Sequence, residues 1–224
     1  MRRRVLAAMS GGVDSSVAAA LLAERGDEVV GVTMKLLPRG ETGFGCCGSP
    51  ADVDDARRVC DRLGIAHYAV DLAELFEAKV IRPYVEAYLS ATTPNPCVEC
   101  NRSVKFGHLL SLAEAWGCDK VATGHYARVE DGRLLKSRDA RKDQTYFLYA
   151  LTARELARAE FPVGGLEKVQ VREKARALGL RVADKAESQE TCFGPGRYVR
   201  GFVAARTETA GGATLPDLTP LLHA

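Results

Sequence analysis

Ser10-Gly11-Gly12-Val13-Asp14-Ser15-Ser16 is the stretch that decides how this chain folds. It joins a short apolar run, residues 4–9, to an amphipathic run that begins at Val17. A strand, a glycine-rich turn and a helix in this order present backbone N–H groups and a helix N-terminus to an anion. The glycines let the backbone approach phosphate oxygens. We therefore predict a phosphate-binding loop in which the Asp14 carboxylate faces a Mg²⁺ ion.

Strand and helix patterns alternate along the first half of the chain. Apolar runs at residues 4–9, 28–34, 65–71 and 120–124 are separated by helical patterns. This predicts an α/β fold, a doubly wound, Rossmann-like parallel sheet with helices on both faces. Such sheets bind ligands beyond the carboxyl ends of their strands, where the Ser10 loop, Met34 and Gly124 should meet. Met34 either faces the ligand or fills the core.

The remaining patterns are shorter. They predict a helix over residues 72–89 that Pro83 kinks or splits, a helix from Asn101 to Trp116, and a hairpin around Asp131-Gly132. Three further helices are expected over residues 145–151, 169–178 and 197–206. We expect three regions: a catalytic domain over residues 1–150, a helical continuation over 151–206, and a tail over 207–224 without fixed structure of its own.

Composition narrows the class of protein. At 46% hydrophobic and 27% charged, 224 residues can bury a sizeable core, which argues against wholesale disorder. A net charge of +2 neither favours nor excludes nucleic acid, although basic residues gather at 2–4, 128–142 and 197–206. No apolar run could span a membrane, and no secretory h-region opens the chain. Seven cysteines, an odd number, do not resemble a secreted disulfide scaffold, so we expect a cytoplasmic protein without a membrane partner.

The cysteines offer several chemistries. Cys97-x-x-Cys100 has the spacing of a zinc-ligand pair or of a redox pair. A four-cysteine zinc site would have to be completed by Cys46, Cys47 or Cys192. Cys192 lies in a polar, irregular segment and is a candidate thiolate. Cys60 and Cys118 fall within patterned elements and are interpreted as small buried hydrophobes.

Seven short motifs occur in the order expected for one family. They are Ser10-Gly11-Gly12-Val13-Asp14-Ser15, Thr93-Pro94-Asn95-Pro96, Cys100-Asn101, Lys105-Phe106, Ala122-Thr123-Gly124-His125-Tyr126, Lys142-Asp143-Gln144 and Ser188-Gln189-Glu190-Thr191-Cys192-Phe193. The first lacks the Gly-Lys-Ser/Thr of a Walker A loop and resembles the SGGxDS loop of the ATP-pyrophosphatase superfamily. Over residues 4–203 the chain closely resembles the bacterial tRNA-specific 2-thiouridylases.

The resemblance implies a nucleotide site and an activity. ATP would adenylate the C2 oxygen of the tRNA wobble uridine, with Mg²⁺ on Asp14. The residues that match the family's ATP-binding positions are Ala8, Met9, Ser10, Gly11, Gly12, Val13, Asp14, Ser15, Met34 and Gly124. The segments that match its tRNA contacts are Asn95, Pro96 and Cys97, at the target base, and Lys142, Asp143 and Gln144.

The resemblance also implies a route for sulfur. Cys192 matches the cysteine that carries a persulfide, delivered by a sulfur-relay protein or a cysteine desulfurase. The terminal sulfur attacks C2 of the adenylated uridine and AMP leaves. Cys100 matches the second catalytic cysteine, which assists release and can form a disulfide with Cys192.

Two departures from the family's pattern leave alternatives open. Where many relatives carry an aspartate, this chain has Cys97, which with Cys100 and Cys192 could hold an iron–sulfur cluster. Members of the family also continue past the second cysteine through a central domain and a β-barrel that grip tRNA, whereas this sequence stops soon after it. The alternative functions are therefore a truncated nucleotide-binding remnant that does not modify RNA, or another ATP-pyrophosphatase such as an amidotransferase-type ligase.

Overall fold

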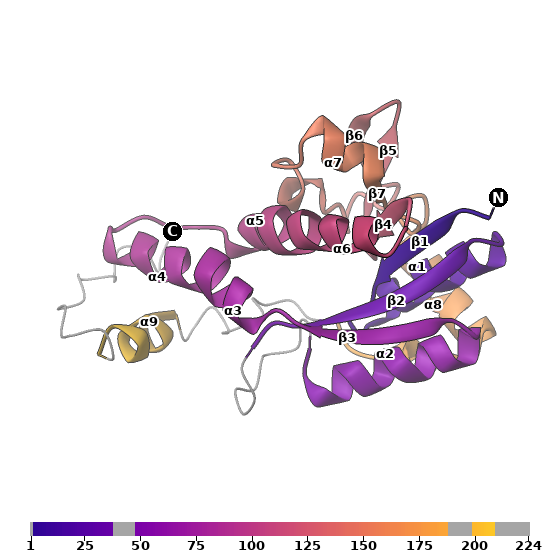
Figure 1. Ribbon diagram of the computed structural model, residues 1–224, viewed down its shortest axis with the longest axis horizontal. Helices are drawn as coiled ribbons and strands as arrows, with labels where there is room; N and C mark the ends of the chain where they lie inside the picture. Colours follow the sequence, from indigo (N-terminus) through magenta and orange to yellow (C-terminus); the bar gives the residue numbers. More distant parts are fainter. Residues whose placement is uncertain (1, 38–47, 188–198, 209–224) are drawn as a thin grey trace.

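The computed structural model describes residues 2–37, 48–187 and 199–208, and within them a parallel sheet of five strands forms the centre (Figure 1). The strands are β1 (Arg4–Ala8), β2 (Glu28–Lys35), β3 (Ala66–Asp71), β4 (Lys120–Ala122) and β7 (Ala159–Glu160). Their order is β3-β2-β1-β4-β7, so β1 lies in the middle and pairs with both β2 and β4. The predicted α/β doubly wound class is confirmed, whereas β7 was not predicted.

Alternation along β1 explains why helices cover both faces of the sheet. Val5 and Ala7 point into one buried cluster, and Leu6 and Ala8 into another, because successive side chains of a strand face opposite ways. The first cluster is closed by α1 (Val13–Glu24), α2 (Pro50–Leu63) and α8 (Lys168–Ala177). The second is closed mainly by helical segments between residues 73 and 115 (Figure 1).

Helix α1 is not the amphipathic helix that we predict from the run beginning at Val17. It is buried almost all round over residues 13–22, including the polar side chains of Ser15 and Ser16. Its outer side is covered by α8 and by the short 3₁₀ helix η4 (Arg181–Asp184). The amphipathic prediction was wrong because the apolar residues 17–22 surround the helix instead of lying along one face, and a helix that is apolar all round is a buried one.

The two long helical segments on the second face each contain a wider π turn. The first runs through α3 (Ala73–Phe76), η1 (Glu77–Ile81) and α4 (Arg82–Leu89). Pro83 lies in the first turn of α4, where its missing N–H is tolerated. The interruption predicted at Pro83 is found just before it, as the π turn η1. The second runs through α5 (Pro96–Glu99), η2 (Cys100–His108) and α6 (Leu109–Ala115). It begins five residues earlier than predicted (101 − 96).

The last part of the described chain is more irregular. The predicted hairpin is confirmed as β5 (Ala127–Glu130) and β6 (Arg133–Lys136), with positive φ at both Asp131 and Gly132. The helix expected over residues 145–151 is only the 3₁₀ turn η3 (Thr145–Phe147), and α7 (Ala153–Arg158) was not predicted. The helix expected near the end is α9 (Val199–Glu208).

Three expectations from the sequence concern features outside the sheet. Cys60 and Cys118 are buried, at 0% and 3% exposure, as predicted. Within the described ranges, no helix is both long and apolar enough to cross a bilayer. The division into three regions stays a prediction, and most of the expected tail, residues 209–224, lies outside the described residues.

Candidate functional site

A cavity of about 250 Å³ lies at the carboxyl ends of β1, β2 and β4. This is the edge of a parallel sheet where ligands bind. Ten of the residues in its wall are ones that the sequence predicts: Ala8, Met9, Ser10, Gly12, Asp14, Ser15, Met34, Gly124, Lys142 and Gln144. The fold therefore brings the phosphate-loop residues and part of the Lys142 segment to one cavity. Gly11 and Val13 are part of the same loop, but they are not among the residues that line this cavity.

The phosphate loop is held by its own serines and by close packing. Ser15 Oγ donates to the Gly12 carbonyl at 3.1 Å and accepts from the Ser10 N–H at 3.1 Å. Gly11 has φ of 73°, and a side chain there would overlap the backbone of Asp52. Gly12 is the N-cap of α1 without a side-chain hydrogen bond. The first N–H groups of a helix have no intrahelical acceptor, so this start is suited to an anion.

Gly124 packs directly against this loop. A Cβ at Gly124 would lie 2.5 Å from Ser15 N and 2.7 Å from the Asp14 carbonyl carbon. Because Gly124 has no side chain, the segment that follows β4 can lie directly against the backbone of the loop. The sequence predicts Gly124 in the site, and the structure shows a packing reason for it.

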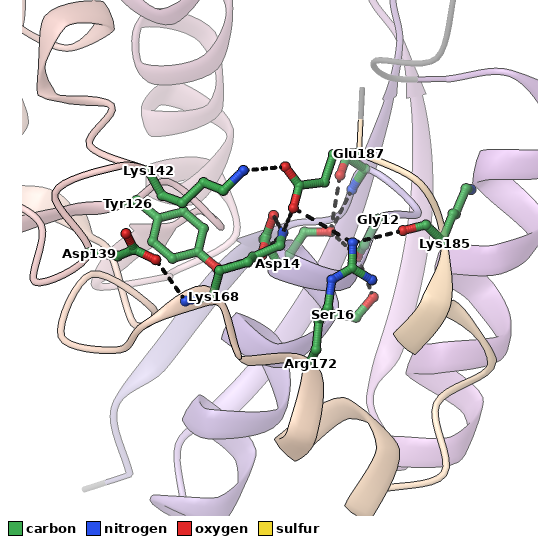
Figure 2. A network of polar contacts seen from close by, with 12 residues as sticks. Gly12, Asp14, Ser16, Tyr126, Asp139, Lys142, Lys168, Arg172, Lys185 and Glu187 are labelled. Carbon is green, nitrogen blue, oxygen red and sulfur yellow. Dashed lines mark hydrogen bonds and ion pairs between the residues drawn. The ribbon is translucent and has the colours of Figure 1, made fainter. Parts of the chain in front are cut away.

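Asp14, the predicted magnesium ligand, is neutralised by a cation of the chain itself. Lys168 Nζ donates to both Asp14 oxygens at 2.7 Å, and the Tyr126 hydroxyl donates to Oδ1 at 2.9 Å (Figure 2). Burial raises the pKa of Tyr126, and the negative charge of Asp14 raises it further. The phenol therefore stays protonated and acts as a donor.

Glu187 connects three basic residues and shares one of them, Lys168, with Asp14. Its carboxylate lies 2.6 Å from Lys142 Nζ, 3.2 Å from Lys168 Nζ and 3.6 Å from the Arg172 guanidinium (Figure 2). The hydrogen bond from Lys142 and the charge of Lys168 hold the pKa of Glu187 below its usual range, against the opposing effect of burial. Glu187 and Lys168 line the cavity together with the predicted residues.

Lys185 ties the same region to the phosphate loop. Its Nζ donates to the Gly11 carbonyl at 3.0 Å and contacts Asp52 and Asp55 at 2.8 Å each. Sequence reasoning missed Lys168, Lys185 and Glu187. The available signal was the position of Lys185 and Glu187 just before the Ser188–Phe193 motif. It was weak, because both residues resemble ordinary surface charges.

The predicted base-contacting segment has a structural role of its own. Asn95 caps α5, and its Oδ1 accepts from the N–H groups of Cys97 and Val98 at 3.1 and 3.3 Å. Asn95, Pro96, Cys97 and Cys100 are not part of the cavity wall described, and Cys100 is buried at 5% exposure.

Two contacts bring this helix toward the cavity. Asn101 Nδ2 donates to the Phe147 carbonyl at 3.1 Å, which joins η2 to the segment after Gln144. Lys105, also in η2, lines the cavity itself. Asp143 does not line the cavity described. Its carboxylate oxygens instead accept hydrogen bonds from Ser137 N and Thr145 Oγ1 at 2.9 and 2.6 Å.

Cys192 lies outside the described residues, as do Cys46 and Cys47. The predicted disulfide with Cys100 and the possible iron–sulfur ligation by Cys97, Cys100 and Cys192 therefore stay predictions. Among the residues that the structure covers, no three histidine, cysteine or acidic side chains gather as a metal site.

Two solved structures of synthetases have a similar fold. NMN synthetase from Francisella tularensis superposes with a TM-score of 0.54 and 17% identity, over 96% of this chain and 90% of that one. A glutamine-dependent NAD⁺ synthetase from Acinetobacter baumannii, in complex with ADP, gives 0.53 and 15%, over 94% and 38%. At such identities the likeness establishes the fold alone.

Curated relatives are much more similar in sequence. The chain is 50% identical over 212 residues to the tRNA-specific 2-thiouridylase MnmA of Geobacter metallireducens, over 89% of this chain and 57% of that protein. It is 56% identical over 211 residues to the protein of the same name from Sorangium cellulosum, over 91% and 54%. The chain thus spans a little over half the length of these relatives. The family described as "tRNA methyl transferase HUP domain" matches residues 3–195, most of the sequence, and this chain belongs to that family.

Proposed function

We propose that this chain binds ATP in the cavity and uses it to adenylate the C2 oxygen of a tRNA uridine, as a step in 2-thiolation. One observation carries the proposal: a single cavity joins the phosphate loop to Lys142 and Gln144. About half of the residues are also identical to those of proteins named tRNA-specific 2-thiouridylases. The family description mentions methyl transfer, but a phosphate loop suits a reaction that releases pyrophosphate.

The loop would bind the phosphates through its backbone. The N–H groups at the start of α1 face the phosphate chain, and Met9 and Met34 supply apolar wall for the adenine. Mg²⁺ fits the donor set, because proteins hold this ion through one or two carboxylates together with substrate phosphates, and Asp14 and Asp52 both line the cavity. The bound ion would neutralise charge on the phosphates.

The tRNA would lie against the segment that begins at Lys142. Tyr146 and Tyr149 follow it and are 64% and 69% exposed, with ring centroids 6.4 Å apart. Exposed aromatic rings beside basic side chains are the surfaces on which unstacked nucleobases pack. Asn95, Pro96 and Cys97 would contact the target base from the neighbouring helix.

Sulfur would reach the uridine through two cysteines. A persulfide on Cys192, loaded by a sulfur-relay protein or a cysteine desulfurase, attacks C2 with its terminal sulfur and expels AMP. The Cys100 thiolate then attacks the inner sulfur, releases 2-thiouridine and leaves a Cys100–Cys192 disulfide. An external thiol must reduce that disulfide before the next cycle.

Incubation with ATP, Mg²⁺, sulfide and unmodified tRNA, followed by nucleoside analysis, tests the adenylation step, because sulfide can attack the adenylated C2 directly and displace AMP. We expect 2-thiouridine, and none from Asp14→Asn. A parallel reaction with S-adenosylmethionine in place of ATP and sulfide should give no methylated uridine. ATP binding without 2-thiouridine would favour the nucleotide-binding remnant. With the physiological sulfur donor, full activity of Cys192→Ser would reject the persulfide route.

A cluster on Cys97, Cys100 and Cys192 is the second route for sulfur. It would need three thiolates and an open iron site. Anaerobic purification that gives protein without iron, but with full activity, would reject it.

A further inference from the structure

We propose that Lys168 is a further residue of the nucleotide site, and that Lys168 and Mg²⁺ are alternative partners of Asp14. Without nucleotide, Lys168 neutralises the carboxylate. When Mg²⁺ occupies Asp14, Lys168 binds the phosphate chain. This inference rests on the proposed binding of ATP and adds a residue that lies 154 positions from the phosphate loop (168 − 14).

The backbone of Lys168 is fixed at the start of α8. Its N–H donates to Asp139 Oδ2 at 3.0 Å. The residue before it, Glu167, is the N-cap of α8 and forms a capping box with Gln170. Because the helix start is anchored on both sides, the Lys168 side chain has a defined origin from which to reach the cavity.

The side chain of Lys168 is buried among acceptors and an aromatic ring. It is 10% exposed, with Nζ at 2.7 Å from both Asp14 oxygens and 3.2 Å from Glu187. The same nitrogen lies 5.6 Å from the centre of the Tyr126 ring. An ammonium group has three donors on a flexible stem, so it can exchange one carboxylate for a phosphate oxygen while keeping another.

Most charged side chains around the cavity are paired with one another without nucleotide, and Lys105 is one further cation in its wall. Four cationic side chains, Lys142, Lys168, Arg172 and Lys185, are paired with four carboxylates, Asp14, Asp52, Asp55 and Glu187. A triphosphate that enters such a set brings several uncompensated negative charges, which is costly in a partly buried site. Mg²⁺ on Asp14 would supply two positive charges and release a third on Lys168.

A second lysine on the same helix provides the comparison. Lys174 pairs with Glu24 at 2.8 Å, with side chains 32% and 45% exposed, and neither lines the cavity. If the Lys168 pair only joined α8 to α1, as the Lys174 pair does, nucleotide and metal would not respond to its removal.

Binding measurements on Lys168→Met test the inference. We expect the affinity for Mg²⁺-ATP to fall about tenfold or more, because a charge-assisted contact to phosphate is lost. Mn²⁺ without nucleotide should bind more tightly than to the wild type, since its competitor for Asp14 is gone; electron paramagnetic resonance of free Mn²⁺ measures this. AMP, which lacks the outer phosphates, should bind within about threefold of wild type. Lys174→Met should change none of the three.

Several outcomes would overturn the inference. Equal losses for ATP and AMP, or weaker Mn²⁺ binding, would mean that Lys168 only supports the fold. Melting curves show whether Lys168→Met is folded, and if it is not, Lys168→Gln and Lys168→Arg replace it, with Arg expected to retain more ATP affinity than Gln. Wild-type protein that binds Mg²⁺-ATP but makes no 2-thiouridine would reject the proposed function and leave this inference standing. Wild-type protein that does not bind Mg²⁺-ATP would reject the inference.

Discussion

Gly124 is a position next to the phosphate loop where one added methyl group should matter. Its Cβ would lie 2.5 Å from Ser15 N, so the phosphate loop or the β4 exit must shift. We expect Gly124→Ala to weaken Mg²⁺-ATP binding about tenfold and to lower the free energy of unfolding by about 1–3 kcal/mol. Calorimetric titration and urea denaturation measure the two. Gly165→Ala, where no atom lies within 4 Å, is the control, and similar effects in both variants would contradict the packing explanation.

Glu187 should make stability depend on pH in the acid range. Its pKa is held below the usual value by Lys142 and by Lys168. The stabilisation is therefore present above the unfolded value of about 4.3 and is lost as the pH falls through the lower folded value. We expect Glu187→Gln to be less stable than wild type at pH 7 and to approach it as the pH falls below the folded pKa of Glu187. Urea denaturation across this range checks the sign, with the exposed Glu114→Gln as control.

The site could be predicted only where its residues are contiguous. The phosphate loop combines two glycines, three serines and an aspartate within seven positions, and this local chemistry is readable without a fold. Lys168 and Glu187 are single charged residues whose meaning comes from contacts with Asp14 and Lys142 across the cavity. Nothing in the sequence near them distinguishes them from solvated surface charges.

At the scale of elements, Asn95 caps α5 and is also predicted to contact the target base, and two substitutions can separate these roles. Its side chain accepts two backbone N–H groups, so Asn95→Ala should cost about 1 kcal/mol of unfolding free energy. Asn95→Asp keeps an acceptor and should retain most of the stability. If Asn95 also contacts the target base through its amide, Asn95→Asp will lose thiolation activity while remaining folded. Equal activity of Asn95→Asp and wild type would leave only the capping role.

The 3₁₀ turn η3 and the residues just after it carry two exposed tyrosines, Tyr146 and Tyr149, which form an aromatic surface. Replacing Tyr146 and Tyr149 together by alanine should weaken tRNA binding by about 1–3 kcal/mol per stacked base, with Mg²⁺-ATP affinity unchanged. Filter binding at fixed salt measures the first and calorimetry the second. Tyr68→Ala is a matched control, since Tyr68 is 52% exposed but packs on Trp116 at 5.1 Å. A similar loss of tRNA binding in Tyr68→Ala would contradict a specific surface.

Elements with a local pattern were predictable, and those that depend on distant packing were not. The hairpin turn is predicted by two adjacent residues, Asp131 and Gly132, which both adopt positive φ. The strand β7 has only two residues and forms because it pairs with β4. Helix α1 has apolar residues all round, and its outer side is covered by α8. The start of α5 at Pro96 was missed because two prolines suggested a break, whereas Pro96 is an ordinary first helical residue after Asn95.

At the scale of the whole molecule, the nucleotide should act as a cross-link between distant parts of the chain. The cavity wall combines residues from the end of β1 with Lys168 at the start of α8 and with Lys185 and Glu187 beyond it. A ligand present at 100 times its dissociation constant adds about 2.7 kcal/mol to the free energy of unfolding. We expect Mg²⁺-ATP to raise the melting temperature and to slow amide hydrogen exchange at residues 10–16 and 168–172 together.

The β5–β6 hairpin tip, at Asp131, is the internal reference for this experiment because it does not line the cavity. Its exchange should not change when nucleotide is added, and AMP should protect the start of α8 much less than ATP does. Protection confined to residues 10–16 would mean that the nucleotide contacts the loop alone. Protection of the start of α8 in the wild type that disappears in Lys168→Met would show that this one side chain transmits nucleotide binding from α1 to α8.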